Sequence, residues 1–110
     1  MKMIQYYFVL LRVGDKWTPE VTEETRQISE GHRKNIEKLV NEGKLLLAGP
    51  FEEEKETTSP GDLDGLFILA VGTKAEALAL LAEDPAIRSG RMVAEVHPWW
   101  GPSGIRFDKG

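Results

Sequence analysis

The sequence predicts an α+β domain with the ferredoxin-like order β-α-β-β-α-β, in which two helices cover one face of a four-stranded antiparallel sheet. Three observations lead to this prediction. The chain contains four strongly apolar segments, and helical patterns separate the first from the second and the third from the fourth. The second and third segments follow each other with only a polar connection between them. The 110 residues are enough for one hydrophobic core, so we expect one domain.

The amino-terminal part of the chain predicts one strand and one long helix. Residues 3–12 (MIQYYFVLLR) are aliphatic or aromatic almost throughout, which is typical of a central strand covered on both faces. The helical pattern opens with Thr18 as a candidate N-cap and Pro19 at the first helical position, and it stops at Gly43. A single helix of that length would span about 36 Å. We therefore expect its first turn to be a separate piece, with the regular helix running from about Glu24.

The middle of the chain predicts two strands joined by a polar loop. Residues 44–51 (KLLLAGPF) form the second strand, which ends at Gly49 and Pro50. Residues 52–64 are charged and carry a Ser-Pro-Gly turn signal, so we expect an exposed connection there. A partner-facing loop is the alternative interpretation of this segment. Residues 65–71 (GLFILAV) predict a third, buried strand.

The carboxy-terminal part predicts a second helix, a fourth strand and a tail. Thr73 and Glu76 have the spacing of a capping box, and the helix must end before Pro85 because the residue preceding a proline is disfavoured in a helix. Residues 91–100 (RMVAEVHPWW) predict the fourth strand, in which Pro98 marks either an edge strand or the strand's end.

The predicted domain covers residues 1–100 and leaves residues 101–110 as a C-terminal extension. This extension is rich in Gly and Pro. Its apolar residues Ile105 and Phe107 are candidates for latching onto a neighbouring molecule.

Composition excludes several classes of function. The net charge of −4 gives no broad basic field, so we expect no nucleic-acid partner. The apolar runs are too short to span a membrane and no secretory leader opens the chain, so we expect a cytoplasmic protein with no membrane partner. The absence of cysteine excludes disulfides, cysteine nucleophiles and thiolate metal sites.

The strand pattern also predicts a homodimer. Two helices can cover only one face of the sheet, yet the first and third strands are apolar on both sides. An uncovered face of this kind would be a large exposed hydrophobic patch. We therefore expect a second copy to pack sheet against sheet in a two-fold dimer.

His32 is an unusual residue in the first helix. At 100° per residue it lies near the middle of an arc of apolar side chains, namely Val21, Ile28, Ile36 and Leu39. An ionisable side chain in that position must either be hydrogen-bonded in the core or line a pocket. A structural histidine is the more common case, and a functional site is the alternative.

Asp84 is unusual because a carboxylate is disfavoured at the end of a helix by the macrodipole. One interpretation is that Asp84 caps the turn that Pro85 begins. The other is that it accepts a proton from one ring nitrogen of His32, since both helices share a face of the sheet. An imidazole oriented by a carboxylate is the usual arrangement of a general base near neutral pH.

Four stretches together resemble the YciI-like (YCII-related) family. They are GHRKNIEKLVNEGKLLLAGPF (31–51), DGLFILAV (64–71), AEDPAI (82–87) and EVHPWW (95–100). The resemblance implies a dimeric ferredoxin-like α/β barrel related in fold to muconolactone isomerases, with a pocket and a His-Asp pair in each subunit. Carried over to this chain, the pair is His32 and Asp84, and Gly49-Pro50 is the turn beside it. Where family members often carry a basic residue one turn before the histidine, this chain has Ser29.

Three functions follow as hypotheses. The first is an enzyme in which His32 is the general acid/base, Asp84 fixes its tautomer, and Ser29 or a backbone N–H near Gly49 polarises a small cyclic or aromatic carbonyl compound. The family resemblance associates this chemistry with dehydrochlorination or isomerisation. The second is a non-catalytic small-ligand-binding or interaction dimer. The third is a cofactor-free monooxygenase whose pocket walls are tryptophans, the candidates being Trp17, Trp99 and Trp100.

We expect no cofactor and no metal ion. The two histidines, His32 and His97, lie in different elements without the spacing of metal ligands. His97 is most simply a surface residue near the edge of the sheet. No Gly-rich phosphate-binding loop occurs between a strand and a helix.

Overall fold

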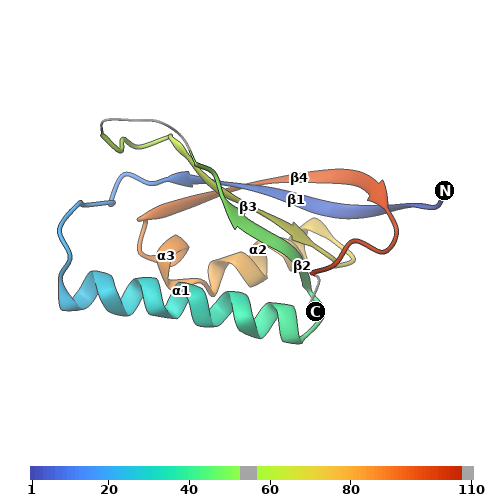
Figure 1. The fold of residues 1–110 in the computed structure, drawn as a ribbon, viewed down its shortest axis with the longest axis horizontal. Coiled ribbons are helices and arrows are strands. Elements are labelled where there is room, and N and C mark those ends of the chain that lie inside the picture. The colour runs from blue at the N-terminus through green and yellow to red at the C-terminus, as the bar shows by residue number, and fades with distance from the viewer. Residues whose placement is uncertain (53–56, 108–110) are drawn as a thin grey trace.

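The helices and strands follow one another in the predicted order, with one short additional helix before the last strand (Figure 1). The structure is a computed structural model and describes residues 1–52 and 57–107. Four residues of the predicted polar connection and the last three of the tail lie outside the described residues. The elements are β1 (Met3–Val13), α1 (Glu23–Asn41), β2 (Leu45–Pro50), β3 (Leu63–Leu69), α2 (Lys74–Ala82), α3 (Pro85–Arg88) and β4 (Met92–Pro102).

The strands form one antiparallel sheet in the order β2-β3-β1-β4. β1 lies inside the sheet, as its apolar sequence predicts, while β2 and β4 are the edges. All three helices lie on the same side of the sheet (Figure 1). The predicted ferredoxin-like fold with helices on one face is therefore confirmed.

The core lies between the helices and the sheet face that they cover. Side chains of a strand alternate between faces, and Tyr7, Val9 and Leu11 of β1 point to the helices. They pack with Leu39 of α1 and Leu81 of α2, both of which are almost fully buried. No helix of residues 1–52 and 57–107 lies over the other face of β1.

The start of α1 differs from the prediction. The N-cap is Thr22, whose Oγ1 accepts a hydrogen bond from Thr25 N at 3.1 Å while Thr25 Oγ1 accepts one from Thr22 N at 2.9 Å. Thr18, the predicted cap, is instead bound to the residue before β4, because the Arg91 guanidinium donates to its side-chain and backbone oxygens at 3.0 and 3.1 Å. The prediction of Thr18 as cap was wrong, whereas the expected regular helix from about Glu24 is close to the observed start at Glu23.

The second half of the chain confirms one cap and extends one strand. Thr73 caps α2 and accepts a hydrogen bond from Glu76 N at 3.1 Å. β4 continues to Pro102, where it pairs with Met3, so it is longer than the predicted segment. Pro98 lies within this strand opposite Tyr7, and β4 is an edge of the sheet. Of the two interpretations of Pro98, the edge strand is right and the strand end is wrong.

The face opposite the helices is largely apolar. Phe8, Leu10 and Leu66 are half-buried on it, and the Trp99 ring lies 6.0 Å from that of Tyr6 and 5.9 Å from that of Phe8. Across the part of the chain that the structure describes, no helix has the length and apolar character needed to cross a bilayer.

Candidate active site

His32 and Asp84, 52 residues apart in sequence, meet where α1 passes the start of α3. His32 Nδ1 lies 2.6 Å from Asp84 Oδ2, a distance typical of a strong hydrogen bond with a charged partner. The Asp84 side chain is completely buried, and the His32 side chain is 21% exposed. The contact is therefore present, and the catalytic role predicted for it stays a prediction.

Asp84 combines both of the functions that the sequence offered as alternatives. Its Oδ1 accepts a hydrogen bond from Ala86 N at 2.8 Å and so caps α3, while Oδ2 faces His32. The carboxylate thus lies at the beginning of a helix as well as after the end of α2. A buried carboxylate is costly unless its oxygens have partners, and here each of the two oxygens has one. This pairing fixes the orientation of the carboxylate toward the imidazole.

The close approach of α1 to α3 depends on Gly31, the residue before His32. A Cβ atom at this position would lie 2.7 Å from Cγ of Pro85, the residue after Asp84. Since real Cβ contacts are longer than this, any larger side chain would push the two helices apart. Gly31 therefore permits the distance at which the imidazole reaches the carboxylate.

The imidazole is held on a second side by Phe67 of β3. The two rings stack with centroids 6.2 Å apart and planes 19° from parallel, and Phe67 is almost fully buried. One face of the ring therefore lies against Phe67, and Nδ1 is paired with the buried Asp84. Within the described residues, Nε2 is the His32 ring nitrogen that has no hydrogen-bond partner.

His32 also lines a pocket of about 360 Å³. The walls of this pocket are mostly apolar and come from β1, β2, β3, β4, α1 and the segment after β4. The lining residues are Leu11, His32, Ile36, Ala48, Gly49, Pro50, Asp64, Gly65, Phe67, Met92 and Phe107. A small concave site with apolar walls and few polar groups is typical of ligand pockets.

Two of the three predicted substrate-binding residues, Gly49 and Pro50, line this pocket, and Ser29 does not. Ser29 is exposed on α1 and borders a separate surface depression with Arg26 and Arg33. Its position therefore gives no support to the substrate-binding role predicted for it.

The backbone N–H of Gly49 is also directed away from the pocket. Phe51 N donates to Asp64 O at 2.9 Å, and residues two apart on a strand direct their N–H groups to the same neighbour. Gly49 pairs with Leu66 in that same register. The N–H of Gly49 itself therefore points to β3, and a backbone donor elsewhere near Gly49 stays a prediction.

His97 and the tryptophans lie outside the pocket. His97 Nε2 donates to Glu95 Oε2 at 2.8 Å on the sheet face without helices. This hydrogen bond, and to a smaller extent the Arg12 guanidinium at 3.3 Å, lower the pKa of the Glu95 carboxyl from its usual value. Trp17, Trp99 and Trp100 are not among the lining residues, so the tryptophan walls of the monooxygenase hypothesis are not supported.

No metal-binding cluster occurs among residues 1–52 and 57–107, since no three His, Asp or Glu side chains come together there.

Several residues that shape the site were not predicted from the sequence. The alternation of β1 and β3 places Leu11 and Phe67 on the helix-covered face and would have identified them as neighbours of His32. Gly31 carried a weaker signal, an isolated glycine inside a helical pattern, which often marks a packing constraint. Phe107 was expected to contact a neighbouring molecule, but it contacts the pocket of its own chain.

Comparison with known proteins agrees with the fold and with the resemblance in the sequence. The sequence model of the YCII-related domain family matches residues 8–100 of this chain. A solved structure with a similar fold is 5-chloro-2-hydroxyhydroquinone dehydrochlorinase from Burkholderia phenoliruptrix AC1100, in complex with 2,5-dihydroxybenzoquinone. It has a TM-score of 0.58 and 18% sequence identity, over 84% of this chain and 92% of that chain. A comparison with curated proteins gives no match. Because the family match spans most of its length, the chain belongs to the YCII-related domain family.

Proposed function

We propose that this protein is a small-molecule enzyme in which His32 Nε2 acts as a general base and Asp84 orients the imidazole. The observation that carries the proposal is the His32–Asp84 hydrogen bond of 2.6 Å directly beside a pocket. A histidine that served only the core would not need a free ring nitrogen at the edge of a cavity.

The pairing favours one tautomer of the neutral imidazole. An ionised carboxylate can only accept hydrogen bonds, so Nδ1 carries the proton that is shared with Asp84 Oδ2. Nε2 then has a free lone pair at the pocket. When Nε2 takes a proton from a substrate, the resulting imidazolium is stabilised by the carboxylate, as in other His-Asp pairs.

The pocket favours a small, flat and mostly uncharged substrate. Aliphatic and aromatic side chains make most of its wall, and its volume of about 360 Å³ suits a single ring with small substituents. We therefore propose a small cyclic or aromatic compound with a carbonyl or hydroxyl group. The structural relative's name, a dehydrochlorinase of a chlorinated hydroxyhydroquinone, is consistent with this class.

For a chlorinated ring compound the proposed reaction is elimination of HCl. The reacting form of a chlorinated hydroxyhydroquinone is its keto tautomer, in which one hydroxyl proton has moved to the ring carbon that carries chlorine and has made that carbon tetrahedral. His32 Nε2 removes the proton of another hydroxyl group that is conjugated with this carbon. The electrons of the O–H bond form a new C=O π bond, the ring double bond shifts toward the chlorine-bearing carbon, and chloride leaves with the electrons of the C–Cl bond. The imidazolium then returns its proton to solvent, so that HCl is the net product beside the dechlorinated compound.

We also propose that the protein works as a homodimer that packs sheet against sheet. Phe8, Leu10 and Leu66 supply an apolar face that no helix of the same chain covers, and Trp99 is 36% exposed beside them. Sedimentation velocity at micromolar concentration tests this: a dimer is expected, and replacement of Leu10 by Glu should give monomers. A wild-type monomer would contradict the dimer.

Chloride release tests the proposed chemistry. The purified protein is incubated with 5-chloro-2-hydroxyhydroquinone and related chlorinated phenols, and free chloride is measured over time. His32→Ala should abolish release, while His97→Ala, the matched control on the other sheet face, should retain it. Equal turnover by His32→Ala would refute His32 as the base. Binding of 2,5-dihydroxybenzoquinone without turnover of any compound would favour the non-catalytic ligand-binding alternative.

A further inference from the structure

We infer that Phe107, a residue of the C-terminal tail, forms the outer wall of the His32 pocket and determines which ligands reach the imidazole. This inference rests on the proposed function for its ligand class, but the position of the wall can be tested without any ligand. Phe107 lies outside the region matched by the family, residues 8–100, so this wall is a feature of this chain beyond the family pattern.

One hydrogen bond and one turn set the path of the tail after β4 ends at Pro102. Ser103 N donates to Lys2 O at 3.0 Å and ties the start of the tail to the beginning of β1. Gly104 has a φ of 90°, a conformation that residues with a side chain rarely adopt, and it reverses the chain. Figure 1 shows the tail returning from the end of β4 toward β2, at the opposite edge of the sheet.

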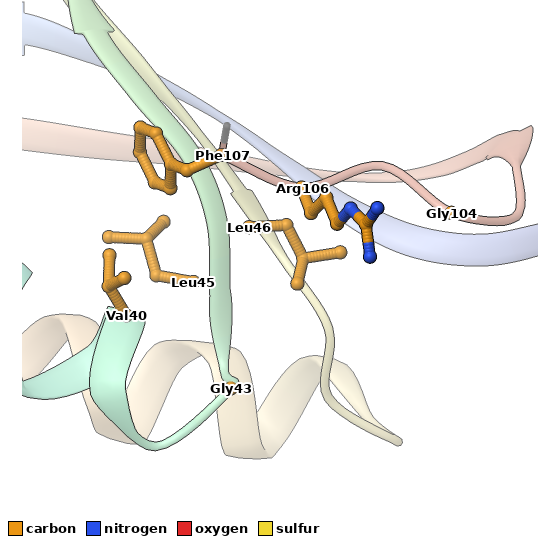
Figure 2. A pocket seen from close by; sticks show the side chains of 7 residues that line it. All are labelled: Val40, Gly43, Leu45, Leu46, Gly104, Arg106 and Phe107. Carbon is orange, nitrogen blue, oxygen red and sulfur yellow. The ribbon is translucent and has the colours of Figure 1, made fainter. Parts of the chain in front are cut away.

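Phe107 lies where the tail meets the seam between α1 and β2. It lines the His32 pocket together with Ile36, and it also borders a larger groove of about 900 Å³ with Val40 and Leu45. In Figure 2 the Phe107 ring lies over the Val40 and Leu45 side chains, whereas the Arg106 guanidinium points away from that ring. Phe107 therefore separates the His32 pocket from the groove under the tail.

Several other wall residues of the pocket are constrained by the fold. Leu11 and Phe67 belong to the buried core, and Gly65 has the Gly49 carbonyl oxygen 2.8 Å from where its Cβ would be. Phe107 is half-buried and lies outside the core cluster. An aromatic ring at this position offers a flat apolar surface to a ring-shaped ligand. A change of size at Phe107 can therefore alter the pocket without altering the core of the domain.

Chemical modification of His32 tests the wall directly. Diethyl pyrocarbonate acylates neutral imidazole nitrogens, and mass spectrometry measures the rate at His32 in each protein. N-acetylhistidine added to the same sample is the internal reference, because its reactivity does not depend on the fold or on the proposed dimer. In Phe107→Ala the rate at His32 relative to N-acetylhistidine should rise severalfold over wild type. Phe107→Leu should stay close to wild type.

Two further variants sharpen the result. Gly104→Ala should displace the tail and raise the relative rate at His32 as Phe107→Ala does, because alanine is strained at the observed φ. Arg106→Ala, the matched control on the same tail, should not change it. An unchanged His32 rate in both Phe107→Ala and Gly104→Ala, or an equal rise in Arg106→Ala, would overturn the inference.

Protection by 2,5-dihydroxybenzoquinone tests the consequence for ligands. The concentration that protects wild-type His32 from acylation should rise about tenfold in Phe107→Ala, since loss of apolar contacts in a pocket has effects of this order. Equal protection of both proteins would overturn the role in ligand selection. If the quinone does not protect wild-type His32 while Phe107→Ala still speeds the acylation of His32, the position of Phe107 as a pocket wall is supported and the proposed ligand class is refuted.

Discussion

Replacement of Asp84 by Asn should leave the fold intact and remove the general base. Asp84 uses Oδ1 for Ala86 N at 2.8 Å and Oδ2 for His32 Nδ1 at 2.6 Å. An asparagine has only one acceptor oxygen for these two partners. Because the backbone N–H of Ala86 can only donate, the oxygen must serve it, and the amide NH₂ then faces His32. The imidazole must accept at Nδ1 and carry its proton on Nε2, the tautomer that cannot take a proton from the pocket.

The expected loss of turnover in Asp84→Asn is larger than its expected loss of folding stability can explain. Loss of one charge-assisted hydrogen bond costs about 1.5–3 kcal/mol of folding stability, which leaves a domain of ordinary stability folded. The same change of tautomer in the Ser-His-Asp hydrolases lowers kcat by about 10⁴. Such a loss equals about 5 kcal/mol of activation free energy, more than the fold loses.

Urea unfolding and chloride release, measured on the same preparation of Asp84→Asn, test this prediction. We expect a moderately lowered free energy of unfolding and a loss of turnover of several orders of magnitude. A folded Asp84→Asn protein that keeps turnover within about tenfold of wild type would refute the orienting role of Asp84.

Two further predictions concern Gly31 and Glu95. Gly31→Ala should lower the free energy of unfolding by up to about 2 kcal/mol, because overpacking against Pro85 costs about 1–3 kcal/mol and the better helix propensity of alanine returns about 1 kcal/mol. It should also lower turnover, whereas the control Ser29→Ala on the same helix should change neither quantity. Urea unfolding measures the stability, and chloride release measures the turnover. For Glu95, carbon-detected NMR titration should give a pKa below 4.5 in wild type and a higher one in His97→Ala, because the hydrogen bond from His97 is the largest cause of the lowering. A carboxyl whose pKa is lowered on folding stabilises the fold above its unfolded pKa, so the destabilisation by His97→Ala should be present above about pH 4.5 and fade as the pH falls through the lowered pKa.

The fold could be predicted from the sequence because each element carries its own local signal. The apolar run of β1, the Thr73 cap and the helical period of α1 are all readable within a few residues. The prediction of Thr18 as N-cap was wrong because a Thr-Pro pair is typical of a helix start, whereas the actual partner of Thr18 is Arg91, a residue far along the chain. Local signals of this kind fail where a distant residue supplies the partner.

The site was predictable only in part, for the same reason. Periodicity placed His32 on the inner face of α1, and the helix end marked Asp84 as unusual, but their contact depends on how two helices pack. The exposure of Ser29 depends on which side of α1 packs against the rest of the domain. The return of Phe107 to the pocket depends on the turn at Gly104 and on the position of β2. None of these tertiary facts has a signature in a short stretch of sequence.

The tautomer of His32 in the wild-type protein tests the central claim most directly. Long-range ¹H–¹⁵N correlation spectra of the ¹⁵N-histidine-labelled protein distinguish a protonated ring nitrogen from one with a free lone pair. The His32 signals are assigned by their absence in His32→Ala. At a pH where the ring is neutral, the account predicts that His32 carries its proton on Nδ1 and leaves Nε2 free. A His32 ring that carries its proton on Nε2 would contradict the proposal that this nitrogen is the base.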